Sequence, residues 1–265
     1  MSVRRFWASA STLVLAVVAA LGMAQPASAA VGGYVALGDS YSSGVGSGSY
    51  ISASGDCDRS TKAYPYLWAA ANSPSSFAFV ACSGATTSSV AGSQLGVLSS
   101  STTLVSVTAG GNDVGFADVM SNCVLYSEST CLSGVNAAVS QMQNSLPSGL
   151  GSLYSAIRSR APQAHVVVLG YPRFYQLNGT CIAGLTETER SAINNASNVL
   201  NGVIAKQAAN AGFTFSSVVD EFTEHEICSG SSWLHSVNWV NIGESYHPTA
   251  TGQSGGYLPA FRSVA

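Results

Sequence analysis

The chain has 265 residues, of which 46% are hydrophobic and only 9% are charged. So little charge excludes a disordered polyelectrolyte and a long coiled coil. The formal net charge is −3, from 10 basic and 13 acidic residues, and no cluster of Lys or Arg occurs, so we expect no nucleic-acid partner.

The first thirty residues have the pattern of a secretory signal. Arg4 and Arg5 precede an apolar run at 13–23, and small residues follow at 27–29. The run is shorter than the roughly 20 apolar residues that a membrane-spanning helix needs. An uncleaved membrane anchor is the alternative, and the arginine pair is compatible with twin-arginine export.

Export defines the mature chain. We predict a signal peptide at 1–30, cleaved after Ala29 or Ala30, and a single domain at 31–265 that is secreted to the extracellular medium. Loss of the two arginines leaves 8 basic and 13 acidic residues, a net charge of −5.

Short apolar runs along the mature chain predict buried strands. Four of them are apolar at consecutive positions, as strands covered by helices on both faces are. These four lie at 34–38, 77–81, 104–109 and 165–170, and a fifth candidate lies at 213–218.

Segments with helical period separate the runs. An alanine-rich helix is predicted at 66–71, and a longer one at 135–160 with a break near Pro147 and Gly149. The clearest helix is 186–211, which opens on a capping box. Alternation of strands and helices predicts an α/β fold with a mostly parallel sheet between helices. Ligands of such sheets bind beyond the carboxyl ends of the strands.

The six cysteines form an even set in a chain predicted to be exported, where disulfides persist. Fifteen pairings are possible, and the sequential one is favoured because it closes short loops. It joins Cys57–Cys82, Cys123–Cys131 and Cys181–Cys228. No Cys-x-x-Cys or His-x-x-x-His spacing occurs, so we expect no metal site.

A serine follows the first predicted strand. Ser40 lies in the glycine-bounded segment 38–44, a suitable place for a nucleophile. A free serine is a weak nucleophile, so this hypothesis requires a histidine base from elsewhere in the chain. The alternative is that Ser40 is only the N-cap of the next helix.

Possible hydrogen-bond donors follow the next two strands. Gly84 lies in the segment 82–86, and Asn112 lies in 110–113. Backbone or Asn N–H groups aimed at a developing oxyanion stabilise acyl transfer. Each segment alone is also explained as an ordinary turn, and their shared place at successive strand ends favours the functional interpretation.

One histidine stands out as the base. His247 has a carboxylate, Glu244, three residues before it, and such a carboxylate orients the ring in serine hydrolysis. Ser254 matches a G-x-S-x-G elbow, but no strand precedes it and too little chain follows it. Of the other histidines, His165 begins a predicted strand, His225 lies in a predicted solvated loop, and His235 lies in a region without a clear structural prediction.

Taken together, these residues resemble the four blocks of the SGNH/GDSL hydrolase superfamily. The blocks are 38–40, Gly84, 111–113 and His247, and the match runs from about 34 to 252. The longer strings GDSYSSG, GGND, VVVLGYPR and ESYHPT are similar to those of secreted actinobacterial GDSL lipases and phospholipase A1 enzymes.

The resemblance implies a three-layer α/β/α sandwich and a role for each matched residue. Ser40 would be the nucleophile and His247 the general base and then acid. The oxyanion hole would comprise the Ser40 N–H, the Gly84 N–H and the Asn112 side chain. Asp39 would support the loop rather than react.

The chain departs from the superfamily pattern before the histidine. The superfamily usually has Asp three residues before it, whereas this chain has Glu244. In this sub-branch a backbone carbonyl can orient the ring instead, here that of Ser245. We favour the carbonyl, and the side chain of Glu244 stays the alternative.

The resemblance implies a secreted serine ester hydrolase that acts on acyl esters of lipids, a lipase or esterase and possibly a phospholipase A1. The alternatives are a carbohydrate acetyl esterase, a phospholipase D-type phosphodiesterase and a secreted binding protein without chemistry. No cofactor is implied; a monomer and transient contact with a lipid interface are expected. Candidate residues for an acyl groove are Tyr41, Phe116, Tyr171, Pro172 and Phe174.

Overall fold

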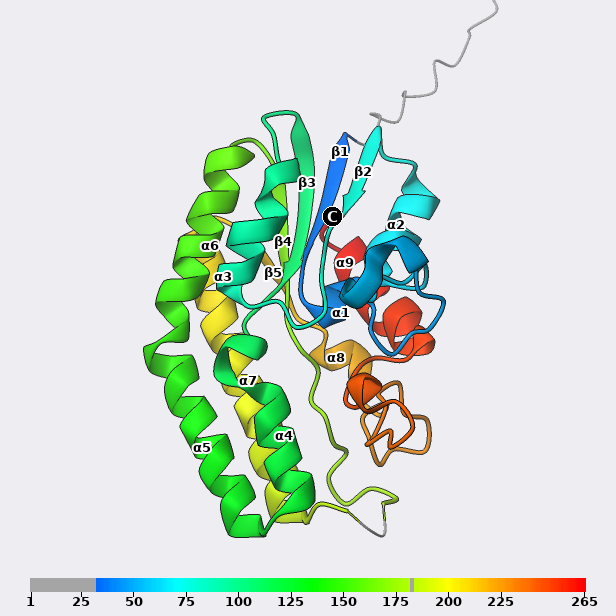
Figure 1. Cartoon of the computed structure of the whole chain (residues 1–265), viewed down its shortest axis with the longest axis vertical. Helices are drawn as coiled ribbons and strands as arrows, with labels where there is room; N and C mark the ends of the chain where they lie inside the picture. The colour runs from blue at the N-terminus through cyan, green and yellow to red at the C-terminus, as the bar shows by residue number, and fades with distance from the viewer. Residues whose placement is uncertain (1–31, 182–183) are drawn as a thin grey trace, which may run out of the picture. The chain divides into compact units, whose positions relative to one another are not determined.

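A computed structural model describes residues 32–181 and 184–265 (Figure 1). The predicted signal peptide at 1–30 lies outside the described residues. The described strands form one parallel sheet in the order β2-β1-β3-β4-β5. All five predicted strands are present, with ends shifted by a few residues: β1 (Gly33–Gly38), β2 (Ser76–Phe79), β3 (Thr102–Thr108), β4 (His165–Leu169) and β5 (Thr214–Ser216).

Helices cover both faces of the sheet, which confirms the three-layer α/β/α prediction (Figure 1). The helices α5 (Glu128–Asn144), α6 (Leu146–Arg160) and α7 (Glu187–Asn210) lie on one face. The helices α2 (Tyr64–Asn72) and α9 (Leu258–Arg262) lie on the other. The shorter helices are α1 (Ser40–Ser43), α3 (Thr87–Ser89), α4 (Phe116–Leu125) and α8 (Val219–Phe222).

The segment 135–160, predicted as a helix with a break near Pro147 and Gly149, lies in two helices, so the predicted break is confirmed to within two residues. The break falls at Ser145, between α5 and α6, and Pro147 lies in the first turn of α6, where its missing N–H costs nothing. Gly149 is helical. A Cβ there would lie 2.8 Å from the Thr87 hydroxyl oxygen, so this glycine lets α3 pack closely against α6.

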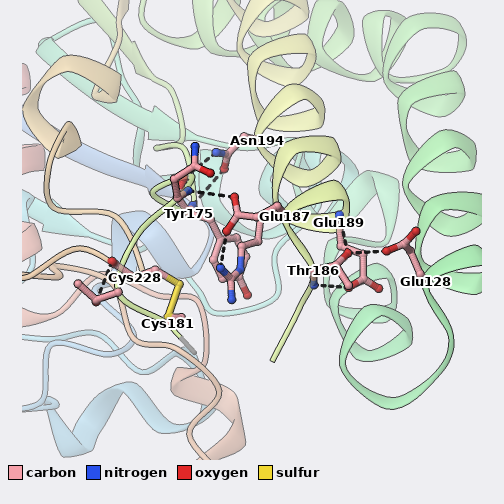
Figure 2. Close-up of polar contacts among 11 residues, drawn as sticks. Glu128, Tyr175, Cys181, Thr186, Glu187, Glu189, Asn194 and Cys228 are labelled. Atoms are coloured by element: carbon pink, nitrogen blue, oxygen red, sulfur yellow. Dashed lines mark hydrogen bonds and ion pairs between the residues drawn. A yellow bond between two sulfur atoms is a disulfide. The ribbon is translucent and has the colours of Figure 1, made fainter. Parts of the chain in front are cut away.

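Two helix starts show how local side-chain bonds set the bounds. The α5 helix begins at Glu128, earlier than predicted, because the Ser127 hydroxyl accepts a hydrogen bond from the Thr130 N–H. The α7 helix opens on the predicted capping box between Thr186 and Glu189 (Figure 2). The Thr186 hydroxyl also donates to the Glu128 carboxylate at 2.6 Å, which ties the two helices together.

Two asparagines of α7 hold the loop that follows β4. The Asn194 side chain accepts from the N–H groups of Phe174 and Tyr175, at 3.0 Å each, and donates to the Tyr175 carbonyl at 2.7 Å (Figure 2). Asn201 binds the N–H and carbonyl of Tyr171 in the same way, at 2.8 and 2.7 Å. The helix thus fixes the loop where it meets the carboxyl edge of the sheet.

Three disulfides connect loops and helices around this framework. They are Cys57–Cys82, Cys123–Cys131 and Cys181–Cys228, the sequential set. The second joins α4 to α5, and the third links the loop after β4 to the segment after α8 (Figure 2). Within the described ranges, no helix is both long enough and apolar enough to cross a membrane.

Candidate active site

The predicted site residues converge on one cavity at the carboxyl edge of the sheet. Ser40, Gly84 and Asn112 follow β1, β2 and β3, and His247 comes from the segment before α9. All four line a cavity of about 500 Å³. The parallel sheet therefore brings together residues that are far apart in the sequence, as the rule for strand ends predicts.

Ser40 is the first residue of α1, immediately after β1. The N-cap of this helix is Asp39, whose carboxylate accepts from the Tyr41 N–H at 3.0 Å, so the alternative in which Ser40 caps the helix is wrong. The turn needs Gly38, which has φ +122°, because a Cβ there would lie 2.4 Å from the Thr108 carbonyl oxygen.

A buried glutamine fixes the same turn. The Gln94 side chain accepts from the Gly38 N–H and donates to the Gly38 carbonyl, both at 2.8 Å. Gln94 is 3% exposed. The role of Gln94 is not predictable from the sequence, because nothing in the local pattern shows that a segment 56 residues away returns to the end of β1.

The His247 ring lies between the serine and a backbone carbonyl. Its Nδ1 is 3.0 Å from the Ser245 carbonyl oxygen and therefore carries the proton, which leaves Nε2 to accept from the Ser40 hydroxyl at 2.8 Å. Burial lowers the pKa of His247 to about 4. The imidazole is therefore neutral, and able to accept a proton, at neutral pH.

The backbone before the histidine sets this arrangement. Tyr246 has φ +65°, a left-handed conformation that is rare for a side chain of this size. The turn directs the Ser245 carbonyl at the ring of His247. The Tyr41 hydroxyl donates to the Tyr246 carbonyl at 2.7 Å, so the histidine loop is anchored directly to α1.

Within 32–181 and 184–265, no hydrogen bond joins the Glu244 carboxylate to the His247 ring. The carboxylate accepts from the Tyr50 hydroxyl at 2.8 Å and from the Asn238 amide at 3.4 Å. Both ring nitrogens of His247 have other partners. The structure thus brings the Ser245 carbonyl to the ring and leaves Glu244 as a link between loops.

The three residues expected to supply oxyanion donors, Ser40, Gly84 and Asn112, all line the cavity. The Asn112 amide donates one N–H to the Ala85 carbonyl at 3.0 Å, which orients the group and leaves its second N–H for a ligand. The Ser40 N–H is at the start of α1, where backbone amides lack an intrahelical partner. Within 32–181 and 184–265, no hydrogen bond engages the Gly84 N–H.

Asp39 connects the serine turn to the neighbouring strand end. Its carboxylate is 1% exposed and accepts from the Thr108 hydroxyl at 2.6 Å and the Tyr171 hydroxyl at 2.5 Å. The Tyr171 oxygen in turn accepts from the Gly111 N–H at 3.3 Å. Burial raises the pKa of Asp39 to about 6. The network ties the Ser40 segment to the Asn112 segment through buried groups.

Apolar side chains make up most of the cavity wall. Four of the five groove candidates line it, whereas Pro172 does not, and its carbonyl accepts from the Ser197 hydroxyl instead. Phe116 and Phe174 stack with their ring centroids 4.8 Å apart. Two further segments of the wall, the α4 helix and a loop near the histidine, were not predicted from the sequence. They contribute Met120, Val124, Leu125, Val237, Trp239 and Ile242.

The remaining histidines and Ser254 lie outside the cavity. His225 lies in a loop after α8, as predicted, and its half-exposed ring stacks on Trp233 with centroids 3.6 Å apart. His235 Nε2 is 2.7 Å from the Gly46 carbonyl oxygen, and His165 Nε2 is 2.6 Å from that of Val264.

A serine hydroxyl bonded to a neutral histidine, beside free N–H donors at the edge of an α/β/α sheet, is the arrangement of a serine hydrolase. The model of the GDSL-like lipase/acylhydrolase family matches residues 36–254. The chain belongs to this family and is a carboxylic ester hydrolase.

Relatives from Streptomyces are similar over almost the whole chain. Lipase 1 of Streptomyces coelicolor is 64% identical over 259 residues, which is 96% of each chain. The crystal structure of phospholipase A1 from Streptomyces albidoflavus NA297 has a TM-score of 0.88 and 65% identity, covering 89% of this chain and 100% of that one. The extracellular lipase from Streptomyces rimosus has a TM-score of 0.87 and 56% identity, with the same coverage.

Proposed function

We propose that the chain hydrolyses acyl esters of lipids, as a lipase or phospholipase A1, through Ser40 and His247. The observation that carries the proposal is the 2.8 Å contact between the Ser40 hydroxyl and His247 Nε2, at the wall of an apolar cavity of about 500 Å³. The relatives named lipase and phospholipase A1 support the substrate class.

Acylation begins with the Ser40 oxygen attacking the ester carbonyl carbon while His247 Nε2 takes the hydroxyl proton. The carbonyl oxygen becomes an oxyanion that accepts hydrogen bonds from the Ser40 N–H, the Gly84 N–H and the Asn112 side chain. His247 then gives the proton to the leaving alcohol. Water, deprotonated by the same nitrogen, attacks the acyl carbonyl carbon, and the bond to the Ser40 oxygen breaks. His247 returns the proton to Ser40, and the fatty acid is released.

Orientation of the base comes from the backbone in this proposal. The Ser245 carbonyl accepts the Nδ1 proton of His247 and partly balances the imidazolium that forms in the transition state. The site is then a Ser-His dyad, and Glu244 acts only on the loops around it. The contacts of Glu244 with Tyr50 and Asn238 support this assignment.

The wall of the cavity favours long acyl chains over acetyl groups. Most of the α4 side chains on the wall are apolar, including Phe116, Met120, Val124 and Leu125, and Ser121 is the polar exception. Burial of apolar surface is worth about 25 cal/mol per Å², so each added methylene of the acyl chain strengthens binding there. An acetyl group would leave this surface exposed to water.

The proposal includes the setting of the reaction. The signal pattern at 1–30 and the three disulfides support secretion of a single domain at 31–265. We propose that the secreted protein acts as a monomer and makes transient contact with the lipid interface.

The test is hydrolysis of p-nitrophenyl esters from acetyl to palmitoyl, with Ser40→Ala as the matched control. We expect activity to peak at medium or long chains and to vanish in the variant. A strong preference for acetyl would instead indicate a carbohydrate acetyl esterase. Equal inactivity of both proteins on every ester would refute the proposal and direct attention to phosphodiesters.

A further inference from the structure

Exposed apolar side chains gather at the mouth of the cavity. Among residues 32–181 and 184–265, five of the nine exposed large hydrophobic side chains come from two short segments. One is the end of α4, where Leu125 is 61% exposed and Tyr126 is 66% exposed. The other is the loop before η5 (Ile242–Glu244) together with the first residue of η5, where Trp239, Val240 and Ile242 are 72%, 99% and 62% exposed.

Both segments continue the wall of the cavity outward. Leu125, Trp239 and Ile242 line the cavity and are also exposed, so at these three apolar side chains the wall reaches the solvent. In Figure 1, α4 and the orange segment that contains the loop lie at the same end of the sheet, beyond the carboxyl ends of the strands.

The loop that displays Trp239 and Val240 has a fixed shape. The Asn238 side chain accepts from the N–H groups of Val240 and Asn241, at 3.1 Å each, which forms an Asx turn. The Asn238 N–H donates to the Ser245 hydroxyl at 2.9 Å. The loop is therefore built onto the segment that carries the histidine, and its tip presents apolar side chains to water.

The exposed segments have almost no charge. Residues 239–243 contain none, and Glu244 is bonded to Tyr50 and Asn238. The two acids of 116–128 are Asp118, exposed in the first turn of α4, and Glu128, whose carboxylate accepts from Thr186. No Lys or Arg occurs in 116–128 or 236–247. The surface therefore has nothing to attract anionic headgroups and is suited to a neutral or zwitterionic surface.

We infer that Tyr126, Trp239, Val240 and their apolar neighbours dock the enzyme on a zwitterionic phospholipid surface, with the cavity mouth facing the lipid. Trp and Tyr favour the boundary between headgroups and acyl chains, and Val adds apolar area there. Docking places the cavity entrance against the lipid, so an acyl chain passes from the surface to Ser40 without crossing water. This inference rests on the proposed lipid substrate.

The test measures binding apart from catalysis. The Ser40→Ala protein is titrated with phosphatidylcholine vesicles while tryptophan fluorescence is recorded. Trp68 is buried and Trp233 packs against His225, so Trp239 is the described tryptophan positioned to respond. We expect a blue shift that saturates with lipid and does not depend on salt. No shift, or binding only to anionic vesicles at low salt, would overturn the inference.

Two variants locate the docking surface. Val240→Glu and Tyr126→Glu place charges on side chains that are exposed and do not line the cavity. We expect each to weaken vesicle partitioning about tenfold or more, while kcat/KM on a short soluble ester changes less than twofold. The matched control is Val97→Glu, at an exposed side chain before the amino end of β3, away from the cavity.

The outcomes separate this inference from the proposed function. Unchanged partitioning in Val240→Glu and Tyr126→Glu, or an equal loss in Val97→Glu, would contradict the docking surface. Vesicle binding by Ser40→Ala needs no catalysis, so it tests the docking surface alone. Absence of soluble-ester hydrolysis by the wild-type protein would contradict the hydrolase mechanism instead.

Discussion

The Tyr50 hydroxyl donates a hydrogen bond to Glu244 at 2.8 Å and accepts one from the Gly46 N–H at 2.9 Å. Glu244 occupies the position, three residues before His247, where an acid that orients a catalytic histidine is expected. In this chain that carboxylate instead connects the loop after α1 to the loop that carries His247. Glu244 therefore connects two loops, whereas the orientation of the His247 ring, which its sequence position suggests, is left to another group.

Replacement of Glu244 by Gln should therefore have a small effect on catalysis. Removal of a true triad acid lowers kcat about 10⁴-fold. We expect Glu244→Gln to lower kcat less than tenfold, because the Ser245 carbonyl still holds the Nδ1 proton. Tyr50→Phe breaks the same link from the other side and should match it. A loss near 10⁴-fold in Glu244→Gln alone would show that the side chain orients the ring.

The pH profile should extend far into the acid range. The base must be neutral, and burial lowers the pKa of His247 to about 4, so kcat/KM should fall only below that pH and by about tenfold per pH unit. The lowered pKa of His247 also affects folding. The histidine of the unfolded chain binds a proton more tightly than that of the folded chain, so the free energy of unfolding decreases as the pH falls from 6.5 toward 4.

Asp39 is a second group near Ser40 that titrates within this pH range, because burial raises its pKa to about 6. The profile of Asp39→Asn separates the two. We expect its acid limb to stay near that of the wild type on a soluble ester. An acid limb near pH 6 that disappears in Asp39→Asn would assign the limb to Asp39 and contradict the prediction for His247.

Removal of one hydroxyl should test the buried network. Tyr171→Phe deletes the donor to the Asp39 carboxylate, and loss of a buried bond to such a group costs about 1–3 kcal/mol. Tyr154→Phe is the matched control, because among the described residues the buried Tyr154 hydroxyl has no hydrogen-bond partner. Thermal unfolding should show a Tm several degrees lower in Tyr171→Phe and no loss in Tyr154→Phe. Equal Tm values would mean that the network contributes nothing to stability.

The amide of Asn112 should contribute to the transition state. Removal of one oxyanion donor typically lowers kcat 10²- to 10³-fold, and we expect Asn112→Ala to fall in that range with little change in KM. Asn144→Ala, at an exposed position at the end of α5, serves as the control. A loss in Asn112→Ala that appears only in KM would point to ground-state binding instead.

Much of the fold was predictable because its signals are local. The apolar runs identified the five strands, and the rule for parallel strand ends brought Ser40, Gly84 and Asn112 to one edge. The α4 helix was missed because it has no side-chain cap and begins after Gly115, whose φ is +67°. Its importance for the cavity is visible only once the sheet is assembled.

The orientation of the histidine could not be predicted from spacing alone. Whether the Glu244 side chain or the Ser245 carbonyl reaches the ring depends on the left-handed turn at Tyr246. The conformation at Tyr246 itself depends on contacts with distant residues such as Tyr41. The residues that hold such turns, including Gln94, act across large separations in sequence and leave no local pattern.

The bond between Cys57 and Cys82 lies two residues from Gly84, and the neighbouring Ser83 N–H donates to the Cys57 carbonyl at 3.1 Å. One wall of the reaction centre is thus joined covalently to the loop after α1. Maturation of the catalyst is therefore an oxidative event as well as a folding event. A chain made in a reducing compartment would lack the cross-link that fixes Gly84. The redox state of the surroundings therefore affects the catalytic rate as well as the stability of the fold.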